Sequence, residues 1–158
     1  DHHGIFLHAI SSPLGEGTNN QAETQAALIG ITWCMDNGYT RIHLEADSNL
    51  LIQWITKVST PPWNICMHIQ KLRDLCNMCD SISYSHVYRE ANYPADSLSK
   101  LSHSLSSTTH YHNLQNLPPQ IRGQIILDYN GTPAFRHKQT NTVHLPPLMS
   151  HLYSYGYG

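Results

Sequence analysis

The chain has 158 residues, enough for one domain with a buried core. Only 13 % of the residues are charged and the formal net charge is −2, so the chain is no bulk polycation and any nucleic-acid contact is confined to a local surface. No stretch is long and apolar enough to span a membrane, and no signal peptide is visible. The four cysteines are expected to be reduced thiols, which favours the nucleus or the cytoplasm.

Strands and helices are expected to alternate along the first two thirds of the chain. Apolar periodicity predicts the segment types, while cap residues such as Ser48 and stop signals such as Asn37-Gly38 predict the helix ends. In chain order we expect strands over 5–10 and 14–18, a helix over 20–37 capped by Thr18 or Asn19, a strand over 41–47, helices over 49–58 and 63–79, a strand over 82–88, and a helix over 93–104. This alternation predicts a layered α/β domain with part of its sheet parallel.

The character of the sequence changes after Ser104. Residues 104–109 are of low complexity, and two Leu-Pro-Pro segments further on are typical of loops. Residues 121–127 fit either a short helix or a strand. We therefore expect one domain over residues 1–104 and a poorly structured tail over residues 105–158.

Three carboxylates stand at the ends of predicted elements. Glu23 lies near the start of the first long helix, on a face that it shares with Ala27, Gly30 and Cys34. Asp47 ends a strand, and Asp96 lies in the first turn of the last helix. Each has an ordinary alternative role: Glu23 and Asp96 could stabilise the helix dipole, and Asp47 could cap the next helix. If the three ends converge, the cluster repels itself unless cations are present, and hard oxygen ligands suit Mg²⁺ or Mn²⁺.

Three segments, in this order and spacing, carry a family resemblance. They are GTNNQAE (17–23), LEADSNLLIQWI (44–55) and REANYPADSLSKL (89–101). Together they resemble the retroviral-type (type 1) ribonuclease H family, and most closely the modules of plant retroelement reverse transcriptases. The resemblance covers about residues 1–104. It implies a ribonuclease H-like three-layer α/β fold with a mixed sheet, and a metal-dependent endonuclease that hydrolyses the RNA strand of RNA–DNA hybrids.

The resemblance also assigns roles to individual residues. Glu23, Asp47 and Asp96 match three of the four carboxylates that hold two Mg²⁺ or Mn²⁺ ions in the family, and so are the expected catalytic and metal-binding residues. Expected substrate contacts come from a turn that touches the minor groove of the hybrid, from a polar pair beside the metal site, and from a residue that holds the last loop. These are, respectively, Asn19, Asn20 and Gln21; Ser48 and Asn49; and Asn92.

The chain departs from the family pattern at its start. The family begins with a strand that carries its first aspartate, and Asp1 does not match that ligand. We therefore expect the first strand and the fourth carboxylate to be missing from this chain, with a fused domain upstream. His86 has about the offset of a histidine that family members often place before the last helix, but it lies in a strand pattern, so its role stays open.

Two competing interpretations concern other residues and the overall activity. Cys76 and Cys79, with Cys66 and His68, could bind zinc. However, Cys76 and Cys79 also continue an apolar helical stripe, which favours a buried core role for these two cysteines.

For the whole chain, the alternative to a nuclease is a non-catalytic nucleic-acid-binding module or retroelement remnant that kept the fold and lost the complete active site.

Overall fold

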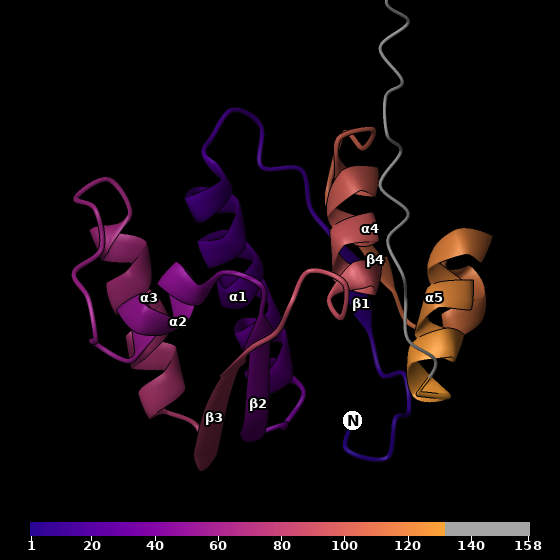
Figure 1. Ribbon diagram of the computed structural model, residues 1–158, viewed down its shortest axis with the longest axis horizontal. Coiled ribbons are helices and arrows are strands. Elements are labelled where there is room, and N and C mark those ends of the chain that lie inside the picture. Colours follow the sequence, from indigo (N-terminus) through magenta and orange to yellow (C-terminus); the bar gives the residue numbers. More distant parts are fainter. Residues whose placement is uncertain (132–158) are drawn as a thin grey trace, which may run out of the picture.

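The protein alternates short strands and helices in a mixed α/β arrangement, as the computed structural model describes it over residues 1–131 (Figure 1). The part of the predicted tail from 132 to 158 lies outside the described residues. In chain order the elements are β1 (Ala9–Ser11), α1 (Asn19–Asp36), β2 (Arg41–Ala46), α2 (Asn49–Ile55), α3 (Cys66–Asn77), β3 (Ser81–His86), α4 (Tyr93–Ser102), β4 (Thr109–Tyr111), the 3-10 helix η1 (Leu114–Asn116) and α5 (Pro119–Tyr129). Within residues 1–131, no helix is both long and apolar enough to cross a membrane.

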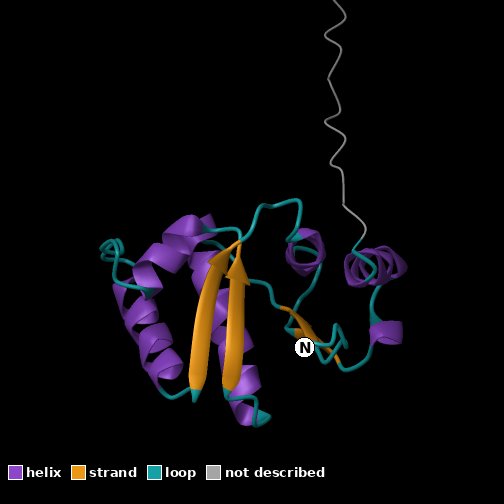
Figure 2. Cartoon of the chain, turned by 60° about the horizontal axis from the view of Figure 1, so that its bottom comes forward, coloured by secondary structure: helices purple, strands orange, loops and turns teal. Residues whose placement is uncertain are grey.

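The strands form two separate pairs (Figure 2). β2 and β3 run parallel over their full length, with Ala46 opposite His86 at their carboxyl ends. β1 and β4 run antiparallel, with Ala9 opposite Tyr111. The expected α/β class is confirmed, and both parallel and antiparallel pairing occur. The parallel pair and the antiparallel pair form separate sheets of two strands each, not the single mixed sheet that the resemblance implies. Within the described residues, β2 pairs along one edge only.

Local signals set both ends of helix α1. The Thr18 hydroxyl accepts from the Gln21 backbone N–H, and the Gln21 side chain accepts from the Thr18 N–H at 2.8 Å, which together form a capping box. The helix ends at Asn37 and Gly38, and Gly38 has the positive φ of 78° that glycine adopts without strain. These are the ends that the sequence predicts.

The buried stripe of α1 differs from the expected one. Its buried residues are Thr24, Ala27, Leu28 and Ile31, whereas Gly30 is exposed. Large apolar side chains decide which face is buried, because Leu28 and Ile31 bury more apolar surface than Gly30 and Cys34 could. Glu23 therefore lies at the border of the buried face rather than in the middle of a stripe of small residues.

A first hydrophobic core joins β2, β3 and helices α1 to α3. The apolar residues of β2 pack inward while Arg41, His43 and Glu45 are exposed on the other face. Leu51 and Trp54 of α2, and Ile69 and Leu72 of α3, are almost completely buried. The whole buried set is Ala27, Leu28, Ile31, Ala46, Leu51, Trp54, Ile55, Ile65, Ile69, Leu72 and Cys76.

A second, smaller hydrophobic core involves β4, α4 and α5, which lie to one side of β2, β3 and helices α1 to α3 (Figure 1). It is formed by Tyr111 of β4, Leu117 and Ile121, with Leu98 and Leu101 of α4 packed against them. The expectation of a poorly structured tail is therefore wrong for the part up to residue 131, because β4 pairs with β1 and α5 packs on α4. Residues 121–127 belong to the helix α5. A domain boundary near residue 104 remains a prediction.

Of two strands predicted near the start of the chain, one is shorter than expected and the other is absent. The strand expected over 5–10 is reduced to Ala9–Ser11, because β4 offers only three residues as a partner. The strand expected over 14–18 is not formed: Gly15 has a φ of 74°, which interrupts an extended backbone, and Thr18 is taken up by the cap of α1. Isolated extended segments gain nothing without a neighbouring strand.

Candidate active site

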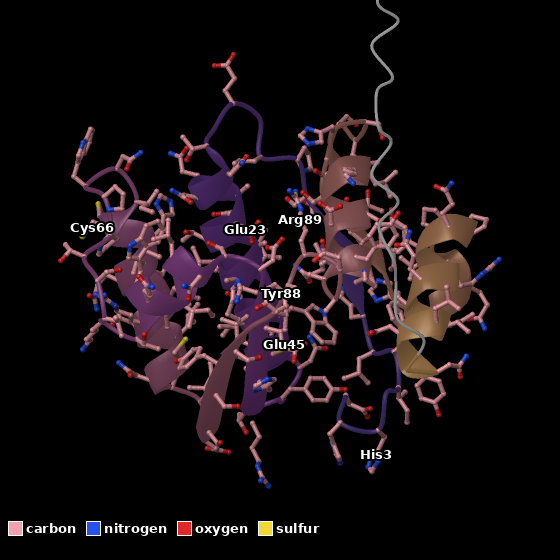
Figure 3. The ribbon with its side chains drawn as sticks, viewed as in Figure 1. His3, Glu23, Glu45, Cys66, Tyr88 and Arg89 are labelled. Carbon is pink, nitrogen blue, oxygen red and sulfur yellow. The ribbon has the colours of Figure 1, made fainter. Side chains whose placement is uncertain are left out.

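Three carboxylates from separate elements lie near one another. Glu23 comes from α1, Asp47 from the residue that follows β2, and Asp96 from the first turn of α4. Asp47 is at the carboxyl end of a parallel strand, where α/β sheets usually place their sites. Figure 3 shows Glu23 on α1, with Arg89 close by on the segment between β3 and α4. The chain thus brings a helix, a strand end and a helix start to one place.

Glu23 is the carboxylate most affected by its surroundings. Burial raises the pKa of Glu23, the negative charges of Asp47 and Asp96 raise it further, and the guanidinium of Arg89 partly offsets them. Glu23 makes no ion pair within residues 1–131, and it lies beyond the first turn of α1. The alternative role of a first-turn glutamate that stabilises its helix does not apply, because the dipole effect fades after that turn.

Asp47 is free of the capping role that the sequence left open. The hydroxyl of Ser48 accepts from the backbone N–H of Leu51 at 3.2 Å, so Ser48 is the cap of α2. The Asp47 side chain is only 16 % exposed, and its Oδ2 lies 3.9 Å from Nε of Arg89. The carboxylate is directed at a cation rather than at the helix.

Asp96 holds two basic side chains at once. Nη2 of Arg89 donates to its Oδ1 at 3.1 Å, and Nζ of Lys100 donates to its Oδ2 at 2.6 Å. Burial by itself would raise the pKa of Asp96, but the hydrogen bonds and charges of Lys100 and Arg89 outweigh burial and lower it. Arg89 therefore bridges Asp47 and Asp96, which ties the end of β2 to the start of α4.

The donor set fits a hard divalent cation in its chemistry. Three carboxylates offer only oxygen, the ligand that Mg²⁺ and Mn²⁺ prefer. Burial first, and then the negative charges of Asp47 and Asp96, raise the pKa of Glu23. Within residues 1–131, however, no three His, Cys, Asp or Glu side chains are already close enough together to hold a metal ion. Asp96 in particular directs both oxygens at Arg89 and Lys100.

The three expected substrate contacts at the start of α1 differ in their surroundings. Asn19 is exposed and Asn20 is half-buried. The backbone carbonyl of Asn20 accepts from the Thr24 hydroxyl at 2.7 Å. Gln21 already uses its side-chain oxygen in the capping box, which leaves its amide N–H₂ as the donor for a ligand.

The remaining expected contacts lie around the same two elements. Asn49 is exposed at the start of α2, next to the Ser48 cap. Asn92 is at the cap position of α4 but makes no side-chain cap; its backbone N–H donates to the Tyr88 carbonyl and its carbonyl accepts from the Asp96 N–H. His86 is the exposed last residue of β3, with its ring edge-on to Tyr88. The roles of all these residues remain predictions.

The cysteines follow the core interpretation rather than the zinc interpretation. All four are free. Cys76 is buried in the first core, and Cys79 packs against that core with its thiol 3.7 Å from Sδ of Met35. Burial raises the pKa of both thiols, which disfavours the thiolate that zinc needs.

Two site residues escaped the sequence analysis. Arg89 lies between β3 and α4 and contacts both Asp47 and Asp96. Lys100 follows Asp96 by four residues on a helix, a spacing at which opposite charges meet, so this contact could have been predicted. Nothing periodic links Arg89 to its partners, because the turn between β3 and α4 decides where it points.

Comparisons with known proteins identify the class of the domain. The mixed α/β fold is that of a ribonuclease H-like domain, and a solved structure of ribonuclease H1 from the halophilic archaeon Halobacterium salinarum NRC-1 is similar to it. That structure has a TM-score of 0.55 and 29 % sequence identity, over 58 % of this chain and 70 % of that one. The family described as reverse transcriptase-like matches residues 1–102, and the chain belongs to this family. A search of curated proteins gives no match.

Proposed function

We propose that this chain belongs to a metal-dependent endonuclease that hydrolyses the RNA strand of RNA–DNA hybrids. The observation that carries the proposal is the approach of Glu23, Asp47 and Asp96 from three separate elements. The likeness to a ribonuclease H1 and the match to the reverse transcriptase-like family support it. As implied by the family, a fourth carboxylate on an upstream strand would complete the ligand set.

Each part of the chain has a task in this proposal. Glu23, Asp47 and Asp96 would hold two Mg²⁺ or Mn²⁺ ions, which when bound supply an activated water and stabilise charge on the phosphate. Asn19, Asn20 and Gln21 would hold the hybrid through its minor groove, since amides both donate and accept without selecting a sequence. Ser48 and Asn49 would contact the hybrid beside the carboxylates, and Asn92 would help to hold the loop before α4.

The test compares two lengths of chain. The 158-residue chain and a version extended upstream by a strand ending in Asp-Gly are incubated with a labelled RNA–DNA duplex, with and without Mg²⁺, beside single-stranded RNA. The extended chain should cleave the RNA of the duplex only with Mg²⁺, and the shorter chain should be nearly inactive. Robust cleavage by the shorter chain would show that the fourth ligand is dispensable or comes from elsewhere.

A substitution in the extended chain separates catalysis from binding. Asp47→Asn should reduce cleavage by at least about 100-fold, because it removes a charge from the ligand set, while binding of the hybrid stays within a few-fold. Asp36→Asn is the matched control, since Asp36 is exposed at the end of α1, away from the carboxylates. Equal cleavage by the Asp47→Asn and Asp36→Asn variants would contradict the catalytic assignment.

A non-catalytic nucleic-acid-binding module is the second candidate. The engagement of both Asp96 oxygens by Arg89 and Lys100 favours it, because a site neutralised by side chains holds together without metal. Hybrid binding by the extended chain without any Mg²⁺-dependent cleavage would decide for this candidate.

The origin and location of the protein belong to the same proposal. The match to a reverse transcriptase-like family supports a retroelement source and a fused upstream domain. The four free cysteines are consistent with the nucleus or the cytoplasm. Sequencing the transcript upstream of Asp1 tests the fused domain directly.

A further inference from the structure

The basic side chains in the carboxylate cluster are much more exposed to solvent than the acidic side chains that they contact. Asp96 and Asp47 have side chains only 10 % and 16 % exposed, whereas those of Arg89 and Lys100 are 59 % and 62 % exposed. The acids are therefore held by the fold. Each base approaches from solvent on a long side chain and can leave without disturbing the core.

The contacts of Asp96 place a positively charged nitrogen on each of its two oxygens. Nζ of Lys100 lies 2.6 Å from Oδ2 and Nη2 of Arg89 lies 3.1 Å from Oδ1. A divalent ion bound to either oxygen, at about 2.0–2.2 Å, would lie near a positively charged nitrogen and be repelled by it. The two bases therefore weaken metal binding at Asp96 as long as they stay in these contacts.

We propose that Arg89 and Lys100 are built-in counter-ions of the carboxylate cluster, which neutralise Asp47 and Asp96 in the metal-free protein and compete with a divalent ion for these two carboxylates. This inference rests on the proposed function, because it takes the three carboxylates as the metal ligands. It assigns to two residues that are not ligands the task of setting the metal affinity and the stability of the metal-free state.

The neutralisation is uneven across the cluster. Asp96 has two close partners, Asp47 has one at 3.9 Å, and Glu23 has no ion pair within residues 1–131. Like charges that are not neutralised repel each other and weaken the fold. The two bases thus lower this cost at Asp47 and Asp96, and they compete with the metal for the same oxygens.

The experiment measures metal binding and stability without measuring activity. Binding of Mn²⁺ to the 158-residue chain is followed by electron paramagnetic resonance, and thermal unfolding is followed in EDTA, for the parent chain and for Arg89→Gln/Lys100→Gln. The matched control is Arg41→Gln/Lys71→Gln, because Arg41 and Lys71 are exposed and make no ion pair within residues 1–131.

The two measurements should move in opposite directions. Loss of the counter-ions should make Mn²⁺ binding about tenfold tighter, within the range of coupling between neighbouring sites, and should lower the unfolding midpoint in EDTA. The control should change Mn²⁺ affinity less than about twofold. Unchanged or weaker Mn²⁺ binding by the Arg89→Gln/Lys100→Gln variant, or no saturable binding by either protein, would overturn the inference.

The outcome is independent of the cleavage assay. Tighter Mn²⁺ binding in the variant, together with no hybrid cleavage by the extended chain, would keep the counter-ion role and remove the proposed nuclease activity. Cleavage by the extended chain, together with equal Mn²⁺ affinities, would keep the activity and remove the counter-ion role.

Discussion

Two adjacent leucines on α2 provide a test of the fold around Asp47. Leu51 is 1 % exposed and lies in the first core, whereas Leu50 is 48 % exposed. Leu51→Ala removes a fully buried side chain and leaves a cavity, which costs about 2–5 kcal/mol of unfolding free energy. Leu50→Ala removes a side chain that is half exposed, so its cost should stay below about 1 kcal/mol.

The two variants are a matched pair, because both replace leucine with alanine in the same helix and so change the helix propensity equally. Urea unfolding followed by circular dichroism gives both free energies, and the slope with urea should be unchanged in both variants. A loss of about 2–5 kcal/mol is a large share of the total stability of a small domain, commonly about 5–15 kcal/mol. Equal losses, or a larger loss for Leu50→Ala, would show that α2 presents a different face to the core and that Asp47, two residues before this helix, is misplaced.

The remaining predictions concern the start of α1 and the histidine beside β1. Thr18→Ala removes the capping box and should cost about 1 kcal/mol in the same urea assay; a change below about 0.3 kcal/mol would contradict the cap. Burial, and then the neighbouring His112 and His110, lower the pKa of His8 below its ordinary 6.5. The unfolded chain then binds the proton more readily, so stability should be constant above pH 6.5 and fall as the pH drops below it. His8→Gln should flatten this dependence between about pH 7.5 and 5.5, and an unaltered pH profile would refute it.

Local signals in the sequence predicted much of the fold. Ser48 and Thr18 marked helix starts that the structure has, and Asn37-Gly38 marked a helix end, because caps and stops act within one turn. The end of β2 at Ala46 placed Asp47 correctly by the same kind of local signal. These features depend on a few consecutive residues and need no knowledge of the rest of the chain.

Features that depend on residues far apart in the sequence were harder to predict. The pairing of Ala9 with Tyr111 gave order to a segment that composition alone assigned to the tail. The burial of Ile31 in place of Gly30 depends on which helix packs against α1, and the position of Arg89 depends on a turn. In the candidate site, the acids followed from the ends of elements and from the family resemblance, and the spacing of four residues could have given the Lys100 contact. The position of Arg89 could not be predicted in this way.

The two hydrophobic cores divide the carboxylates between them. Glu23 and Asp47 are carried by elements of the first core, and Asp96 by α4, whose Leu98 and Leu101 pack in the second. Parts of a protein with separate cores can open at different free energies. Opening of the second unit alone would carry Asp96 away while Glu23 and Asp47 kept their places. Amide hydrogen exchange would then be faster in α4 than in the helices of the first core, because Asp96 would separate from Glu23 and Asp47 before the first core unfolds.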